Sequence, residues 1–371
     1  MARQNVGNPK FYIDMPSLWW AKGNIEGVGT SINNLVGQSD YRPNLIGLNP
    51  SDYIDETLVY NIGREYRIKL KNGVYLPHKT DDKYFIGFFG HNLEDLGVKF
   101  SSIKLYDHDG TIVYENPSGG LSIDEICNWD GGDGFAYNGW SLGQWTGGDS
   151  SKFYEIGIKL ESDSYLEART ILGSLAFGYV YQMPHSPDLS LSMERDYSGV
   201  NEQTTRGGST LTQINYASPP DWAGVPAWEL YDNSIGGLIN SGLKEVRNAE
   251  RGRRKWNLKF SYIDSDDLFS GNENLLTSNP TDIATNTDSG YSDSDFNASG
   301  NFLKFFGRDS SFVSMMMFST MGGALPFIFQ PDGNNNAPDQ FALCRLDQGS
   351  LKFSQVAPQV YNVNLKIREV W

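Results

Sequence analysis

The sequence contains few of the residues on which cross-linking, metal binding and acid–base catalysis depend. Only two of its 371 residues are cysteines and four are histidines. Cys127 and Cys344 lie far apart and outside any metal-ligand spacing, so we expect no disulfide framework and a reducing compartment. The histidines, none of which has a partner at ligand spacing, are His78, His91, His108 and His185. We therefore expect no metal site and no cofactor.

Long apolar runs and an excess of basic charge are also missing. No run of eighteen apolar residues occurs, so a membrane span is not expected. The first residues, MARQNVGNPKFY, include no apolar stretch typical of a signal peptide, which predicts synthesis in the cytoplasm. The chain has 30 Lys and Arg residues and 45 Asp and Glu residues, which gives a net charge of −15. Because binding to nucleic acid requires neutralisation of phosphates, a nucleic-acid partner is not expected.

Motifs of common enzyme classes are absent. The chain has no G-x-S-x-G, P-loop or Rossmann fingerprint. Carboxylates are abundant but gather in loops, where solvated surface charge is the usual explanation, although a glycosidase pair stays open. We expect a protein that is not an enzyme.

What the sequence does have is typical of an all-β protein. Forty glycines provide turns, and 39% hydrophobic and 13% aromatic residues are enough for substantial cores. Short segments with strand-like patterns recur along the chain, which favours sandwich or jelly-roll-like folds. Examples are 66–70, 83–93, 98–106, 153–160 and 171–184.

The last strand organises the C-terminal half. In YNVNLKIREVW (361–371), Tyr361, Val363, Leu365 and Ile367 share one face, a period of two that indicates a half-buried strand. A matching strand begins at Trp256, with Leu258, Phe260 and Tyr262 on one face. The runs 322–332 and 339–346 lie between them in sequence. We predict that these four segments form one sheet in which the C-terminal strand is held between others.

The length of the chain predicts two domains. We expect an extended, irregular N-terminal arm over 1–55, a jelly-roll-like β-sandwich over 56–183, and a second β domain over 184–371. The second domain carries a long acidic loop, 264–300, without Lys or Arg. Within the arm, the apolar knot 16–23 packs either on its own domain or on a neighbouring protein. The Met-rich segment 312–323 predicts a short core helix.

Two groups of residues are candidate binding sites. Trp129, Trp140 and Trp145 stand among glycines and could form a platform for sugar rings, although burial in the core is the more favoured interpretation. The one basic cluster consists of Lys244, Arg247, Arg251, Arg253, Arg254 and Lys255. In so acidic a chain, we expect this cluster to pair with the acidic loop of a neighbouring copy, which would close a ring.

Several stretches carry a resemblance to a known family. The run RRKWNLKFSY, GGALPFIFQPD, DQFALCRL and YNVNLKIREVW resembles the C-terminal half of minor structural proteins of tailed bacteriophages. The segment GYVYQMPHSPDLSLSMERDY (178–197) is similar to the same virion family. FIGFFGHNLEDLGVKFSSIKLYDHDG (85–110) looks like the galactose-binding-like jelly rolls found in phage proteins.

This resemblance implies a structural component of a phage particle, at the tail tip or baseplate. It would reside in the virion, contact other virion proteins and form a homo-oligomeric ring without catalytic residues. Two alternatives stay open. One is a carbohydrate-binding module that recognises a host surface glycan, and the other is a capsid decoration or adaptor protein. Fold alone does not decide among them.

Overall fold

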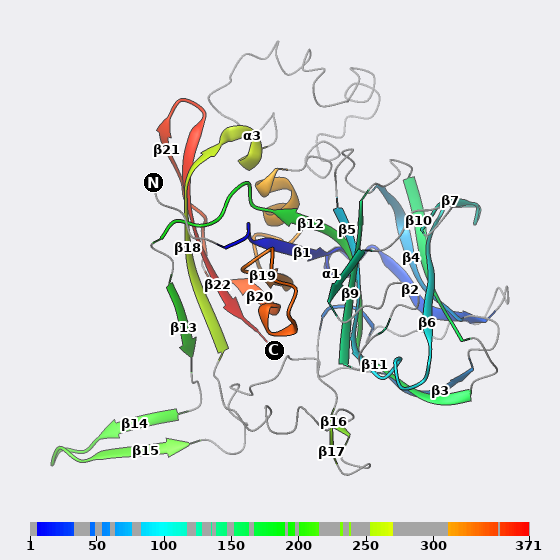
Figure 1. Ribbon diagram of the computed structural model, residues 1–371, viewed down its shortest axis with the longest axis horizontal. Coiled ribbons are helices and arrows are strands. Elements are labelled where there is room, and N and C mark those ends of the chain that lie inside the picture. Colours follow the sequence, from blue (N-terminus) through cyan, green and yellow to red (C-terminus); the bar gives the residue numbers. More distant parts are fainter. Residues whose placement is uncertain are drawn as a thin grey trace.

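The computed structural model places most of the chain in antiparallel strands, which confirms the predicted all-β class with sandwich-like parts (Figure 1). A long sheet is shared by the two halves of the sequence, and a smaller sheet packs on one end of it. The described residues are 6–32, 45–48, 54–59, 64–75, 83–116, 124–127, 135, 139–146, 152–162, 167–189, 192–196, 200–214, 231–232, 237–238, 253–269, 311–347 and 349–370.

A β-sandwich occupies the first half of the sequence. One layer is the five-stranded sheet β2 (Ile25–Ile32), β4 (Arg64–Tyr75), β10 (Lys152–Glu161), β6 (Lys99–Tyr106) and β7 (Ile112–Asn116), in that order. The facing layer contains β12 (Ser174–Gln182), β5 (Lys83–His91), β9 (Gly139–Thr146) and β8 (Asp124–Cys127). One hydrophobic cluster includes buried side chains from both layers, so the layers bury their apolar faces together. A short pair, β3 (Ile54–Val59) and β11 (Glu167–Leu172), lies beside this sandwich.

The facing layer continues into the second half of the chain. From β12 the order runs through β1 (Lys10–Asp14), β19 (Phe327–Gln330), β20 (Ala342–Leu346), β22 (Val360–Glu369) and β18 (Arg253–Asp264) to β13 (Ser192–Asp196). β21 (Phe353–Ala357) pairs with β22 off this path. The four C-terminal segments therefore form one sheet, with the last strand held between neighbours, as the sequence predicts. Whether residue 183 ends a domain stays a prediction.

The alternation in the last strand is confirmed, and that in its partner is interrupted. Tyr361, Val363, Leu365 and Ile367 are all buried, whereas Trp371 lies outside the described residues. In β18 the expectation that Tyr262 points inward is wrong, because it is 55% exposed. A bulge between Phe260 and Ile263 gives Tyr262 a φ of 63° and brings Ile263 into the core instead.

The N-terminal segment is not the irregular arm that the sequence predicted, at least where it is described. It forms β1, the helix α1 (Met15–Ala21) and β2. β1 pairs with β12 and β19, and all five of its residues are buried. Phe11 and Ile13 lie in one core cluster and Tyr12 in the other, so the strand lacks the polar alternation that marks a half-exposed strand. The knot 16–23 packs on its own chain, since Trp19 is 3% exposed and contacts Phe153 and Phe177.

β1 also fastens the start of the chain to a loop of the second half. The Gly7 N–H donates to Asp332 at 2.7 Å, and the Lys10 Nζ donates to the Gly333 carbonyl at 2.8 Å. A side chain at Gly333 would collide with the Asn8 carbonyl, so glycine permits this close approach. The N-terminal strand thus bridges the two halves of the long sheet.

Several local features complete these layers. Asp107 and Gly110 form the hairpin turn between β6 and β7, and β6 has a bulge near Ser101. The Met-rich segment forms a short π-helix (Val313–Phe318) with Met315 and Met316 in the core. In 153–160, however, a register shift beside Tyr154 buries Phe153 and leaves Tyr154 half-buried.

The remaining elements lie outside these layers. The strands β14 (Val200–Thr204) and β15 (Thr210–Ile214) form a hairpin of their own, and β16 (Tyr231–Asp232) pairs with β17 (Gly237–Leu238). The acidic loop 264–300 is described only to residue 269, where the short helix α3 (Ser265–Leu268) follows β18. The rest of this loop lies outside the described residues.

Candidate functional site

The candidate tryptophan platform does not assemble from the two tryptophans that the structure describes. Trp140 and Trp145 lie five positions apart on β9, so they project from opposite faces of the sheet. Trp140 is fully buried and stacks on Phe89, with a ring-centroid distance of 6.2 Å. Trp145 is 1% exposed and stacks on Tyr84. Their burial favours core packing, and Trp129 lies outside the described residues.

The basic cluster is described at Arg253, Arg254 and Lys255, and two of these bind within the chain. The Arg254 guanidinium pairs with Glu369 at 3.0 Å and donates to the carbonyls of Asp339 and Phe341. Burial opposes this charge, but the Glu369 carboxylate raises the pKa of Arg254 above its usual value.

Lys255 pairs with Asp196 of the adjacent strand at 2.8 Å. Arg254 and Lys255 therefore have partners within the chain, and the contact with a second copy that the sequence predicted for the basic cluster stays a prediction. Lys244, Arg247 and Arg251 lie outside the described residues, as does most of the acidic loop.

His91 is a structural residue at the end of β5. It is fully buried, and its Nδ1 accepts from the Leu93 N–H while its Nε2 lies 3.1 Å from the Ser141 Oγ. Burial lowers the pKa of His91 to about 3, so the ring stays neutral and its Nε2–H donates to Ser141. Within the described ranges, no group of His, Cys, Asp and Glu could hold a metal ion.

The outer face of the five-stranded sheet carries the densest charged network of the described residues. Arg67 donates to Glu65 and Glu155, each at 2.8 Å, and its guanidinium stacks over the Tyr106 ring at 4.6 Å. The Tyr106 hydroxyl donates to Glu65 at 2.5 Å, and burial together with this carboxylate raises the pKa of Tyr106 well above its usual value. Both carboxylates bind the Arg67 guanidinium, so the charged groups of this network are paired with one another. The network is therefore a set of paired surface side chains and not an open binding site.

A different surface, which we call the edge ribbon, consists of Leu189, β13 and the hairpin 200–214. All five side chains of β13 are at least partly exposed, although its partner β18 lies in the core sheet. Leu189, Met193 and Leu211 are 56%, 51% and 59% exposed, so each of these apolar side chains is more than half open to solvent. Exposed apolar side chains on strands at the edge of a sheet are typical of an interaction surface.

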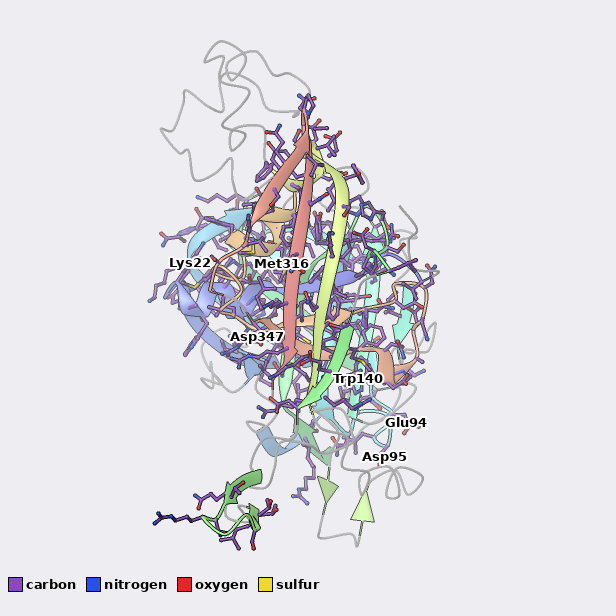
Figure 2. The ribbon with its side chains drawn as sticks, turned by 90° about the vertical axis from the view of Figure 1, so that its left-hand side faces the viewer. Lys22, Glu94, Asp95, Trp140, Met316 and Asp347 are labelled. Atoms are coloured by element: carbon purple, nitrogen blue, oxygen red, sulfur yellow. The ribbon has the colours of Figure 1, made fainter. Side chains whose placement is uncertain are left out.

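The edge ribbon was not identified from the sequence, which shows only a Gly-, Ser- and Thr-rich stretch there. The signal was present in TTRGGSTLT, where a Gly207–Gly208 pair separates Thr-rich segments. In the structure the Gly208 φ is 83°, and the Thr205 and Ser209 backbones close the turn. This hairpin projects from the described body in both views (Figures 1 and 2).

Comparison with known proteins adds no relative. No family model matches the chain, and no curated protein is significantly similar to it. None of the helices in the described part of the chain is both long and apolar enough to span a membrane.

Proposed function

We propose that the chain is a non-enzymatic structural component of a bacteriophage particle, at the tail tip or baseplate, that assembles through subunit contacts. The resemblance of the C-terminal strands to minor tail proteins supports the phage context. The edge ribbon is the observation that carries the assembly role, because it offers strand edges and exposed apolar side chains away from the chain's own core.

The body of the protein suits a mechanical role. The long sheet, with its N-terminal strand inserted between the two halves and its C-terminal strand held between neighbours, gives a rigid base for projecting elements. The two described tryptophans of the glycan platform are buried, so the carbohydrate-binding alternative has less support.

The experiment is localisation in purified particles. Particles would be banded on a density gradient and probed with an antibody against this chain, followed by electron microscopy of the labelled particles. We expect the chain to co-sediment with particles and the label to mark the tail end. Label on the capsid would favour the decoration or adaptor alternative, and absence from particles would refute the proposal.

A glycan array separates the remaining alternative. An assembly protein should show no glycan binding above that of a heat-denatured sample, whereas a carbohydrate-binding module should bind a defined set of sugars. Specific binding by chains that are absent from particles would replace the proposed function with the glycan-binding one.

A further inference from the structure

We propose that the hairpin β14–β15 of one copy adds as a strand to the open edge of β13 in a second copy of this chain. This inference rests on the proposed function and names its contact. Addition of a strand to a sheet edge uses main-chain hydrogen bonds for affinity and side chains for register. The edge ribbon contains both halves of such a contact, since β13 is the acceptor edge and β15 the added strand.

The hairpin lacks the support that a β-hairpin needs. It is a two-stranded sheet without a third strand among the described residues, and such hairpins are marginally stable alone in water. Its described side chains, 203–212, are exposed except for the half-buried Thr205. A third strand from another molecule would pair the outer edge of β15 and cover Leu211.

The acceptor edge has the matching features. β13 pairs with β18 on one side and is the terminal strand of the long sheet, so no described strand pairs with its other side. Met193 and nearby Leu189 are more than half exposed. β13 and β15 are both five residues long, so one can cover the full length of the other.

Charge favours the pairing of β15 with β13 over that of two β13 edges. The residues of β15, TLTQI, are uncharged, so they oppose no charge of β13 in any register. β13 reads SMERD, and an antiparallel pair of two copies centred on Glu194 would place two glutamates directly opposite each other, which is destabilising.

Within one chain the hairpin is a sheet of its own, separate from the sheet that contains β13. Only residues 197–199 separate β13 from β14, and these two strands do not pair. The hairpin instead extends from the end of β13 away from the body (Figure 1). Donor strand and acceptor edge are then different surfaces, which makes the contact heterologous, and repeated use of it produces a ring or a filament.

Disulfide trapping tests this pairing directly. Met193→Cys and Leu211→Cys are made separately in a Cys127→Ser chain, and the two proteins are mixed and oxidised. Cys344 is retained, because it is fully buried and burial raises the pKa of its thiol well above its usual value. Met321→Cys, at a 50% exposed methionine outside the edge ribbon, measures random collision.

The expected product is a heterodimer joined through positions 193 and 211, several-fold more abundant than either homodimer or any product of the Met321→Cys control. The double variant should give a ladder or a closed ring on a non-reducing gel. Three results would overturn the inference: a product joined only through 211 and 211, one joined only through 193 and 193, or no product above the control.

The outcome is independent of the localisation experiment. If the chain marks the tail end of particles but the 193–211 product is absent, the proposed function stands and this contact is wrong. If the product forms but the chain is absent from particles, self-assembly stands and the phage role fails. Each variant should keep the Tm of the parent, since both positions are exposed.

Discussion

A buried carboxylate at the start of α1 should make the stability of the protein fall as pH rises. Asp14 is 2% exposed and caps the helix, accepting from the Ser17 N–H at 2.9 Å and from the Ser17 hydroxyl. Its other oxygen accepts from the Phe177 N–H of β12 at 3.2 Å. Burial raises the pKa of Asp14 from 3.8 to about 6, although the hydrogen bonds from Ser17 and Phe177 act in the opposite direction.

The sign of the effect follows from proton binding. Between pH 3.8 and about 6 the folded chain holds a proton at Asp14 that the unfolded chain has released. The stability that the protonated Asp14 contributes is fully present below pH 3.8. It is lost as the pH rises, until the carboxyl of the folded chain has also ionised. At about 1.36 kcal/mol per pH unit, the difference between the two pKa values corresponds to about 3 kcal/mol, of which about 2 kcal/mol is lost between pH 4 and pH 7.

The test compares the wild type with Asp14→Asn by chemical unfolding across this pH range. The asparagine oxygen still accepts from Ser17 but carries no charge, so we expect the stability of the variant relative to wild type to rise by about 2 kcal/mol from pH 4 to pH 7. Glu26→Gln is the control, because Glu26 pairs with Lys69 on the exposed face, and its effect should stay within about 0.5 kcal/mol. A wild-type-to-variant difference that does not change with pH would refute the reasoning.

One deletion and three substitutions test the packing. Deletion of 366–371 removes the fully buried Ile367 and the partner of Arg254, so we expect insoluble protein, and a cooperative thermal transition like that of wild type would contradict this. Trp145→Ala should cost about 4 kcal/mol in denaturant unfolding; loss of glycan binding by a variant with unchanged stability would argue against core packing. Arg254→Met leaves Glu369 buried without its cation and should cost about 3 kcal/mol, whereas Lys255→Met, at a more exposed pair, should cost less than about 1 kcal/mol.

The sequence predicted best the elements whose burial is one-sided. The last strand alternates strictly because one face packs on the core, and this pattern placed its inward residues correctly. β1 has no such pattern, since both of its faces are buried, with Phe11 and Ile13 in one core cluster and Tyr12 in the other. The helix beside it did carry a readable signal, an Asp14 cap followed by Pro16 at the first turn.

Bulges and long-range pairs explain the other differences. The alternating pattern of β18 predicted the wrong face for Tyr262, because no local sequence signal marks the bulge before Ile263. The partners of Arg254 lie about a hundred residues away, so the cluster looked like surface charge in the sequence. The edge ribbon was missed because a sequence does not show which strands lie at the edge of a sheet with their apolar side chains exposed.

The basic cluster and the edge ribbon differ in what they leave available for assembly. Arg254 and Lys255 are engaged within the chain, so reversing the charge of Arg254 would damage folding before it tested any subunit contact. Leu211 and Met193 have the opposite character, because substitution there removes little from the chain's own packing. A variant such as Leu211→Asp should therefore fold with an unchanged Tm yet fail to join other copies. If it assembles as well as wild type, the contact between copies must lie outside the edge ribbon.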